Sequence, residues 1–414
     1  MMDGSSPKAT PMLVTPSEWS ENSFYDLAKI TSGQVDPRKA PYNSMILVAP
    51  DHIRTGSGRI DQRLTAIQQG AISGKYLVKK GEVIYSKIRP NLQKLALADE
   101  DCLCSADMYP VAAKEGVSAL FLKYLMLSAP FTEFATSVSV RSGMPKINRQ
   151  ELAHFSAVVP DSYEEQEAIA EALSDADALI EELERLILKK RLIKQGAMQS
   201  LLTAERRLPG FSGEWKRYRL SEIGEVTGSG VDKKIVEGEQ PIRLLNYTDV
   251  YREQYITGRI LHHWVTASEQ KARRCRIRNG DIFFTPTSET PDDIARSAVA
   301  LEDIEDAAYS YHVVKLRLNK VDSRDFWAHI FETEDFRRQA RLNADGSGTR
   351  YVVTLRKFRN MEISIPNETE REAIGETLRD MSAEIHALVT RLEKARQVKD
   401  GMMQNLLTGR IRLD

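Results

Sequence analysis

The sequence has 414 residues and a nearly balanced charge, with 58 Lys and Arg against 59 Asp and Glu. The formal net charge of −1 argues against binding of nucleic acid by bulk electrostatic attraction alone, so such binding would need local basic clusters. Three cysteines form no zinc-binding pattern, and no apolar run approaches the about 18 residues of a membrane span. We therefore expect a cytoplasmic protein without metal or membrane contacts, folded as two or three domains.

The chain begins with a segment that has no core-forming pattern. Residues 1–16 are rich in small residues and proline, and we expect them to form a flexible tail. Residues 17–160 are expected to form a first globular region, in which residues 79–86 have the pattern of a turn followed by a buried strand. The stretch Gly70–Tyr76 resembles a phosphate loop, but it has one residue too few between its glycines and lacks the Ser or Thr that would bind magnesium. We interpret it as a turn.

Residues 161–208 have the pattern of a long amphipathic helix that serves as a spacer and docking region. Pro160 marks the entry, and apolar residues then recur at alternating spacings of four and three, at Ile169, Leu173, Ala176, Ile180, Leu183 and Ile187. About 36 residues at about 1.5 Å each give a helix of about 54 Å, which is longer than a compact domain needs. A core helix of one large domain is the alternative interpretation.

The second half of the chain repeats the first. Residues 209–366 are expected to form a second globular region, and residues 367–414 a second spacer helix with a docking region. Residues 370–413 align without a gap on residues 165–208, with 21 of 44 positions identical. We therefore predict an α+β protein with a pseudo-twofold internal repeat, in which two globular mixed α/β domains are separated by two long antiparallel helices that form a coiled coil.

Basic residues gather in local clusters together with Ser, Thr, Asn or Tyr, which are the residue types that contact phosphates and base edges. For any single residue, ordinary solvated surface charge is the alternative interpretation. The candidate DNA-contacting residues are Ser86, Lys87, Arg89, Asn91, Lys94, Arg141, Lys146 and Arg149 in the first region, and Thr285, Thr287, Arg350, Tyr351 and Arg356 in the second.

The sequence contains no recognisable catalytic constellation. It has neither Gly-x-Gly-x-x-Gly nor His-Glu-x-x-His, and no Asn/Asp-Pro-Pro-aromatic motif of the kind used to methylate adenine. Pro291–Asp293 resembles the start of a nuclease motif, but no acidic-x-Lys follows at a usable spacing. His262 and His263 lie near Cys275, but adjacent strand residues face opposite sides and do not suit a shared metal. A non-catalytic recognition or scaffold subunit is therefore expected.

The order of these elements resembles the specificity subunit of Type I restriction-modification enzymes over essentially the whole chain. The motifs that carry the resemblance are Glu165–Ala170 after Pro160, Gly196–Thr203, Gly401–Gly409 and Tyr85–Asn91, the last of which is typical of a target-recognition domain of this family. The second copy departs from the first at Arg371, where the first has Gln166, and at Gly409-Arg410, where the first has Ala204-Glu205.

The resemblance implies a DNA-binding subunit of a phage-defence system. Each globular region would be a target-recognition domain that reads one half of an asymmetric, bipartite site on double-stranded DNA, and the helices would set the gap between the halves. The subunit would carry no cofactor and no catalysis of its own. It would recruit two adenine-N6 methyltransferase subunits that use S-adenosylmethionine, and two restriction subunits that translocate and cleave DNA with ATP and magnesium.

The repeated helix ends are the expected docking regions for the methyltransferase subunits, because a duplicated element suits two copies of one partner. We expect the leucines at these ends to be exposed, which would make the isolated subunit poorly soluble. The candidate docking residues are Gly196, Met198, Gln199, Leu201 and Leu202 in the first copy, and Gly401, Met403, Gln404, Leu406 and Leu407 in the second.

Two other functions are compatible with these patterns. One is a coiled-coil adaptor that presents two divergent domains to protein partners, although such an adaptor would not require basic loops rich in Ser, Thr and Asn. The other is a specificity subunit of a methylation-only or phage-exclusion system, since a restriction subunit would be encoded elsewhere.

Overall fold

The computed structural model describes residues 18–139 and 145–413, which fold as two compact units. Of the described residues, the first unit comprises 18–139, 145–185 and 390–413, and the second comprises 186–389. Each unit therefore contains one globular domain, the first part of the long helix that follows it and the last part of the other long helix. The tail expected at residues 1–16 lies outside the described residues.

The first domain is a mixed α/β domain. Its elements are β1 (Trp19–Ser23), α1 (Phe24–Leu27), β2 (Ala28–Ile30), β3 (Gln34–Val35), β4 (Leu47–Val48), β5 (Lys75–Val78), β6 (Val83–Ser86), β7 (Leu95–Leu97), β8 (Cys102–Cys104), β9 (Met108–Ala113), α2 (Ala119–Leu127), α3 (Ala129–Val138), α4 (Arg149–Leu152) and β10 (Ser156–Pro160). Two four-stranded sheets have the strand orders β2-β9-β6-β7 and β3-β5-β8-β4. Strands β1 and β10 pair antiparallel, so the start and the end of the domain lie together.

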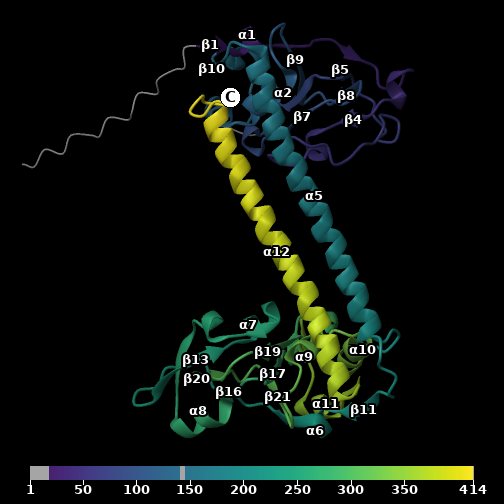
Figure 1. Ribbon diagram of the computed structural model, residues 1–414, viewed down its shortest axis with the longest axis vertical. Helices are drawn as coiled ribbons and strands as arrows, with labels where there is room; N and C mark the ends of the chain where they lie inside the picture. Colours follow the sequence, from purple (N-terminus) through teal and green to yellow (C-terminus); the bar gives the residue numbers. More distant parts are fainter. Residues whose placement is uncertain (1–17, 140–144, 414) are drawn as a thin grey trace, which may run out of the picture. The chain divides into compact units, whose positions relative to one another are not determined.

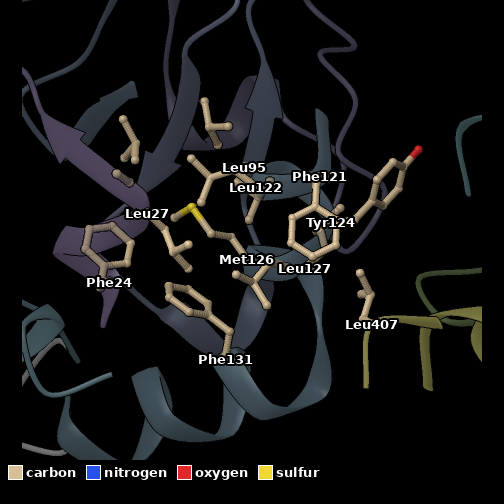
Figure 2. Packing of buried hydrophobic residues seen from close by; sticks show 14 of the residues in the cluster. Phe24, Leu27, Leu95, Phe121, Leu122, Tyr124, Met126, Leu127, Phe131 and Leu407 are labelled. Carbon is tan, nitrogen blue, oxygen red and sulfur yellow. The ribbon is translucent and has the colours of Figure 1, made fainter. Parts of the chain in front are cut away.

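Helices α2 and α3 begin at serines and bury their apolar sides in the core of the first domain. Ser118 Oγ accepts a hydrogen bond from Phe121 N–H at 3.1 Å, and Ser128 Oγ accepts one from Phe131 N–H at 3.4 Å. Each cap satisfies a backbone donor that the first turn of a helix leaves free. Figure 2 shows the apolar cluster that results, which includes Leu407 from the far end of the chain.

The second domain uses the same plan with additional strands. Its elements are β11 (Lys216–Arg219), α6 (Leu220–Ile223), β12 (Gly224–Thr227), β13 (Gln240–Leu245), α7 (Tyr247–Arg252), β14 (Tyr255–Ile256), β15 (Trp264–Ala267), α8 (Glu269–Cys275), β16 (Arg276–Ile277), β17 (Ile282–Phe284), β18 (Thr287–Ser288), β19 (Ser297–Ala300), β20 (Ile304–Tyr309), β21 (Val314–Leu318), α9 (Arg324–Ile330), α10 (Glu334–Asn343), β22 (Asp345–Ser347), β23 (Arg350–Val352), α11 (Leu355–Asn360) and β24 (Glu362–Ile365). The sheet orders are β12-β21-β17-β19-β14, β15-β13-β20-β16 and β18-β23-β22, and β11 pairs with β24.

The two long helices are α5 (Tyr163–Leu201) and α12 (Glu368–Leu406), and each has 39 residues. Their heptad seams begin inside the domains that precede them. Ile169 and Leu173 of α5 are buried in the core of the first unit, and Ile374 and Leu378 of α12 are buried in that of the second. The prediction of two long repeated helices is thereby confirmed.

In the first unit the two helices contact each other through charged side chains. Asp177 of α5 pairs with Lys399 of α12, and Glu184 Oε1 lies 2.7 Å from Arg396 Nη2. Position along α5 rises from Asp177 to Glu184 while position along α12 falls from Lys399 to Arg396, as an antiparallel arrangement requires.

The helices also contact each other in the second unit. Lys190 Nζ of α5 lies 2.6 Å from Glu384 Oε1 of α12, and Met198 and Met381 pack on the same apolar core. The antiparallel coiled coil predicted from the heptad pattern is therefore confirmed, and Figure 1 shows α5 and α12 as the two long helices of the chain.

The leucines at the helix ends are buried, so the prediction that they are exposed is wrong. Leu406 and Leu407 each expose 4% of their surface and belong to the core of the first unit. Leu201 and Leu202 belong to the core of the second unit, where they expose 8% and 3%. The physical reason is that each domain leaves part of its core open, and the end of the helix that follows the other domain completes it.

Candidate nucleic-acid and partner interfaces

In the second domain a β-hairpin and a neighbouring strand border a cavity of about 620 Å³. Strand β23 pairs with both β22 and β18. Gly346 of β22 has φ +143°, and a Cβ at this position would lie 2.1 Å from the Arg350 carbonyl oxygen, so the hairpin requires glycine there. Lys357 Nζ holds the base of the hairpin through an ion pair with Asp345 Oδ1 at 2.6 Å. The cavity is lined by Tyr247, Tyr251, Thr287, Ser288, Glu289, Asp293, His312, Thr349 and Arg350.

Two tyrosines of α7 form a stacked pair at this cavity. Tyr247 and Tyr251 are one helical turn apart, and their ring centroids lie 6.0 Å apart with an angle of 13° between the planes. Asp249 Oδ2 accepts a hydrogen bond from Asn246 N–H at 2.8 Å and so fixes the start of the short helix. The pair therefore presents aromatic faces at a defined place.

His312 is the imidazole of the cavity, and it lies against Tyr311 with ring centroids 3.8 Å apart. Burial lowers the pKa of His312 from its usual value, and the positive charges of Lys233 and Arg350 lower it further. This favours the neutral ring, in which one nitrogen donates and the other accepts.

Charges of both signs surround the cavity. Arg350 is exposed, and it has no hydrogen bond or ion pair from its side chain within the described ranges 18–139 and 145–413. The carboxylates of Glu289 and Asp293 face the same space, and hydrogen bonding from the Thr290 hydroxyl, together with Arg296, lowers the pKa of Asp293. Aromatic faces, a free guanidinium and carboxylate acceptors together suit a flat ligand with hydrogen-bonding edges, such as a nucleobase.

In the first domain two cationic side chains, Lys87 and Arg149, lie near the ring of Tyr109. Lys87 Nζ lies 5.3 Å from the centre of the Tyr109 ring, and the Arg149 guanidinium lies 5.5 Å from it. Lys87 Nζ also donates to the Ala106 carbonyl oxygen, and Arg149 Nη2 donates to that of Thr31 at 3.2 Å. Burial lowers the pKa of Lys87, and the positive charge of Lys146 contributes to the same effect.

The loop after β6 is held by the segment at residues 145–147. Arg89 N–H donates to the Pro145 carbonyl oxygen, and Ile147 N–H donates to that of Lys87, both at 2.9 Å. Arg89 has φ +48°, an unusual conformation for a residue with a side chain, and its side chain is exposed. Asn91 is exposed in the same loop. The structure thus brings Lys87, Arg89, Lys146 and Arg149 together, as a candidate interface needs.

Ser86 and Thr285 must be removed from the set of direct contacts. They expose 2% and 0% of their surface because each stands at the end of a buried strand, β6 or β17. Ser86 Oγ donates to the Ile88 carbonyl oxygen at 3.0 Å, and Thr285 Oγ1 accepts from Arg296 N–H at 3.0 Å. Both hydroxyl groups therefore shape the following loop from inside the domain.

The remaining candidates occupy several different places. Thr287 and Arg350 line the cavity of the second domain, while Tyr351 beside them packs partly on the core. Arg356 is exposed on α11 and does not line that cavity, and Lys94 Nζ donates to the Ile53 carbonyl oxygen. Arg141 lies outside the described residues.

The sequence analysis did not identify the aromatic residues of the cavity, which are Tyr247, Tyr251 and His312. Tyr247 and Tyr251 carry a usable signal, since tyrosines four residues apart share a face if the segment is helical. His312 carries no such signal, because β18, β23 and the segment after β20 meet only in the folded domain.

Grooves lie at corresponding places along the two long helices. The groove of the first unit has a volume of about 670 Å³ and is bordered by Lys399, Met403 and Gln404 of α12. In the second unit Lys194 and Met198 of α5, the counterparts of Lys399 and Met403 in the repeat, border a groove of about 280 Å³. The candidate docking residues Met198, Met403 and Gln404 therefore lie at open surface.

The cysteines are buried free thiols, and burial raises the pKa of Cys102 to about 12. Within residues 18–139 and 145–413 no group of three or more His, Cys, Asp or Glu side chains is placed to hold a metal ion. No helix in the described part of the chain combines the length and the apolar character needed to cross a membrane.

The model of the family described as the Type I restriction modification DNA specificity domain matches residues 16–191 and 212–395. The Type I restriction enzyme EcoDI specificity subunit of Escherichia coli is 32% identical over 224 residues, which are 53% of this chain and 48% of that protein. The chain thus matches about half the length of that relative.

Solved structures show the same fold. A chain from a structure of the type I R-M system has a TM-score of 0.61 and 17% identity, with 96% of this chain and 100% of that chain covered. The HsdS subunit from Thermoanaerobacter tengcongensis has a TM-score of 0.53 and 17% identity, with 97% and 99% covered. Two domains joined by two long helices are therefore an arrangement found in known proteins.

Proposed function

The chain belongs to the family of Type I restriction-modification DNA specificity subunits, and from this membership we propose that it selects the DNA site on which its partner subunits act. Each domain reads one half of an asymmetric, bipartite site on double-stranded DNA. The two long helices set the unread gap between the halves. The chemistry belongs to the partners, and this chain contributes recognition alone.

The observation that carries the proposal is that two domains of one plan present different side chains at corresponding loops. Ser86 and Thr285 stand at the ends of corresponding buried strands. The loop that follows carries Lys87 and Arg89 in the first domain, whereas in the second domain it leads to the cavity that Arg350 lines. Arginine and lysine recognise guanine edges, and carboxylates accept hydrogen bonds from cytosine. Two different surfaces on a repeated scaffold suit two different half-sites.

The repeated grooves support docking of two copies of one partner, the adenine-N6 methyltransferase subunit. Restriction subunits then join through that complex. S-adenosylmethionine, ATP and magnesium belong to these partners. The docking residues that we propose are those of the repeated helix ends that border or flank the grooves, namely Gly196, Met198 and Gln199, and Gly401, Met403 and Gln404.

The modest charge of the chain is compatible with this role. A net charge of −1 leaves little long-range attraction for DNA, so the partners must supply much of the positive surface that surrounds the duplex. The specificity subunit then needs only a limited set of local contacts, such as those around Tyr109 and Arg350.

The test is to co-express the chain with the methyltransferase subunit from its own operon and to map N6-methyladenine across the host genome. We expect a new bipartite motif with a fixed gap, which disappears when the chain is omitted. A stable complex with an active methyltransferase that adds no such motif would contradict the proposal and favour a protein adaptor.

A further inference from the structure

In the first unit, two cations of α12 are each neutralised by a carboxylate of α5. Lys399 Nζ lies 2.5 Å from Asp177 Oδ1, and Arg396 Nη2 lies 2.7 Å from Glu184 Oε1. The Lys399 side chain is only 11% exposed. Its ammonium group has therefore lost most of its hydration, and the ion pair with Asp177 compensates for this loss.

The Asp177 carboxylate is also the centre of a larger network in that unit. The Tyr124 hydroxyl donates to Asp177 Oδ2 at 2.7 Å, and Lys123 Nζ lies 3.7 Å from the same oxygen. The network joins α2, α5 and α12 and leaves no ammonium group there without a partner.

The second unit keeps both cations and lacks both carboxylates. The gapless alignment of Glu165 on Glu370 gives each of the four residues a counterpart. The counterparts of Arg396, Lys399, Asp177 and Glu184 are, in that order, Arg191, Lys194, Ser382 and Val389.

Arg191 and Lys194 border the groove of about 280 Å³ between α5 and α12. Within residues 18–139 and 145–413 the side chain of neither cation makes a hydrogen bond or an ion pair. Ser382 Oγ donates to the Leu378 carbonyl oxygen of its own helix at 2.6 Å, and the nearby carboxylate of Glu384 is paired with Lys190.

Helix α9 presents an imidazole, and not a carboxylate, to Lys194. His329 of α9 stands six residues after the N-cap Ser323, as Tyr124 of α2 does after Ser118. Burial, with a smaller contribution from Lys194, lowers the pKa of His329 to about 4. His329 is therefore neutral at pH 7. Burial also lowers the pKa of Lys194, as expected of an ammonium group that has lost water without gaining an anion.

We propose that the groove bordered by Arg191, Lys194, Ser382 and Ile385 binds acidic side chains of a docked protein partner. These side chains take the places that Asp177 and Glu184 occupy in the first unit. The inference rests on the proposed function, in which the partner is the methyltransferase subunit. The two docking sites are then unequal, because the chain itself neutralises the cations of one site and the partner must neutralise those of the other.

A protein carboxylate fits the groove better than a DNA phosphate. The repeat itself provides the precedent, since carboxylates fill the corresponding positions of the first unit. The apolar side chains of Met198 and Ile385 border the groove beside the cations, and such a mixture of apolar and charged groups is typical of a protein interface.

The test introduces into the second unit the two carboxylates that the first unit has at Asp177 and Glu184. The double variant Ser382→Asp with Val389→Glu supplies internal carboxylates, and Ser382→Asn with Val389→Gln is the matched neutral control. Binding of the purified methyltransferase subunit to the full chain is measured at about 50 mM and about 300 mM salt, with stoichiometry from native mass spectrometry. The melting temperature of each variant shows whether it is folded.

We expect the neutral control to bind two copies, one of which weakens with salt, and its salt-sensitive affinity to fall much less than that of the acidic variant. The acidic variant should keep its melting temperature, lose about tenfold or more in the salt-sensitive affinity and lose the salt dependence itself. Lys194→Met should weaken the same affinity.

Three results would overturn the inference. In the first, the acidic variant binds both copies as the neutral control does. In the second, Lys194→Met leaves methyltransferase binding unchanged but lowers the affinity of the assembled complex for DNA, which would show that the groove binds a DNA phosphate. In the third, wild-type chain binds no methyltransferase at any salt concentration, which would overturn the proposed function itself.

Discussion

Arg207 and Glu370 form a bidentate ion pair in the second unit, with Arg207 Nη2 2.6 Å from Glu370 Oε2. Glu370 is fully buried. Arg412 and Glu165 repeat the pair in the first unit, with both nitrogen–oxygen distances at 2.9 Å. In each unit the segment that follows one long helix is thereby tied to the first turn of the other.

Arg207→Met should destabilise the second unit, because it leaves the buried Glu370 carboxylate without a counterion. We expect the melting temperature to fall by about 5 °C or more in a calorimetric scan. Arg412→Met should have a smaller effect, since Trp19 Nε1 also donates to Glu165 at 3.2 Å. Arg217→Met, which breaks an exposed pair with Glu362, is the control. Equal shifts for all three variants would contradict the assignment.

Leu407→Ala should destabilise the first unit by about 2–5 kcal/mol, although the residue lies near the end of the chain. The reason is that Leu407 is 4% exposed and completes the core of a domain that begins at the other end of the sequence. Urea unfolding measures the difference. Leu413→Ala removes the same side chain where it is 40% exposed, and it should change the free energy of unfolding by less than about 0.5 kcal/mol. A small effect of Leu407→Ala would mean that the helix end does not close the core.

The long helices could be predicted because their signal is local. Ile169 and Leu173 belong to a heptad pattern, and the second copy repeats this pattern at Ile374 and Leu378. The partners of the helix ends could not be predicted in the same way. The sequence predicts that Leu407 is exposed at the end of a helix. Its burial depends on contacts with residues far away in the chain.

The candidate sites show the same division between local and long-range information. Basic loops such as the one with Lys87 and Arg89 are visible in the sequence, whereas the burial of Ser86 depends on where β6 ends. The loss of partners at Lys194 is visible only when the register of α5 against α12 is known, because the carboxylate that pairs with its counterpart belongs to the other helix.

The stability of the second unit should fall as the pH falls below about 6.5, because of His329. Burial first, and then Lys194, lowers the pKa of His329 to about 4, while the unfolded chain takes up this proton near pH 6.5. Since the unfolded state binds more protons in this window, unfolding becomes easier as the pH falls. The loss attributable to His329 between about pH 7.5 and about pH 5.5 is about 1.4 kcal/mol.

His329→Gln isolates this contribution, since glutamine is neutral and can still accept the hydrogen bond from Gln254 Nε2. Urea unfolding of both proteins at the two pH values gives the comparison. The variant should lose about 1.4 kcal/mol less than the wild type over this range. Parallel pH profiles for the two proteins would show that His329 is as accessible to protons when folded as when unfolded.

Single arginines should affect one half-site each. Arg350→Ala in the second domain and Arg89→Ala in the first are expected to reduce discrimination by about 1–3 kcal/mol at one half of the bipartite site, and to leave the other half unchanged. The reason is that Arg350 is exposed at a cavity with aromatic faces, while Arg89 is exposed on a loop of the other domain.

The measurement uses the complex with the methyltransferase subunit and DNA in which one half-site is altered at a time. Arg273→Ala is the matched control, because Arg273 is 79% exposed on α8 and paired with Glu269, and it should change neither half. If Arg350→Ala instead weakened binding to all sequences equally and reduced the dependence on salt, Arg350 would contact a phosphate. The bases would then be read by the tyrosines and His312 of the same cavity, and Tyr251→Ala would be expected to change the half-site preference that Arg350→Ala left intact.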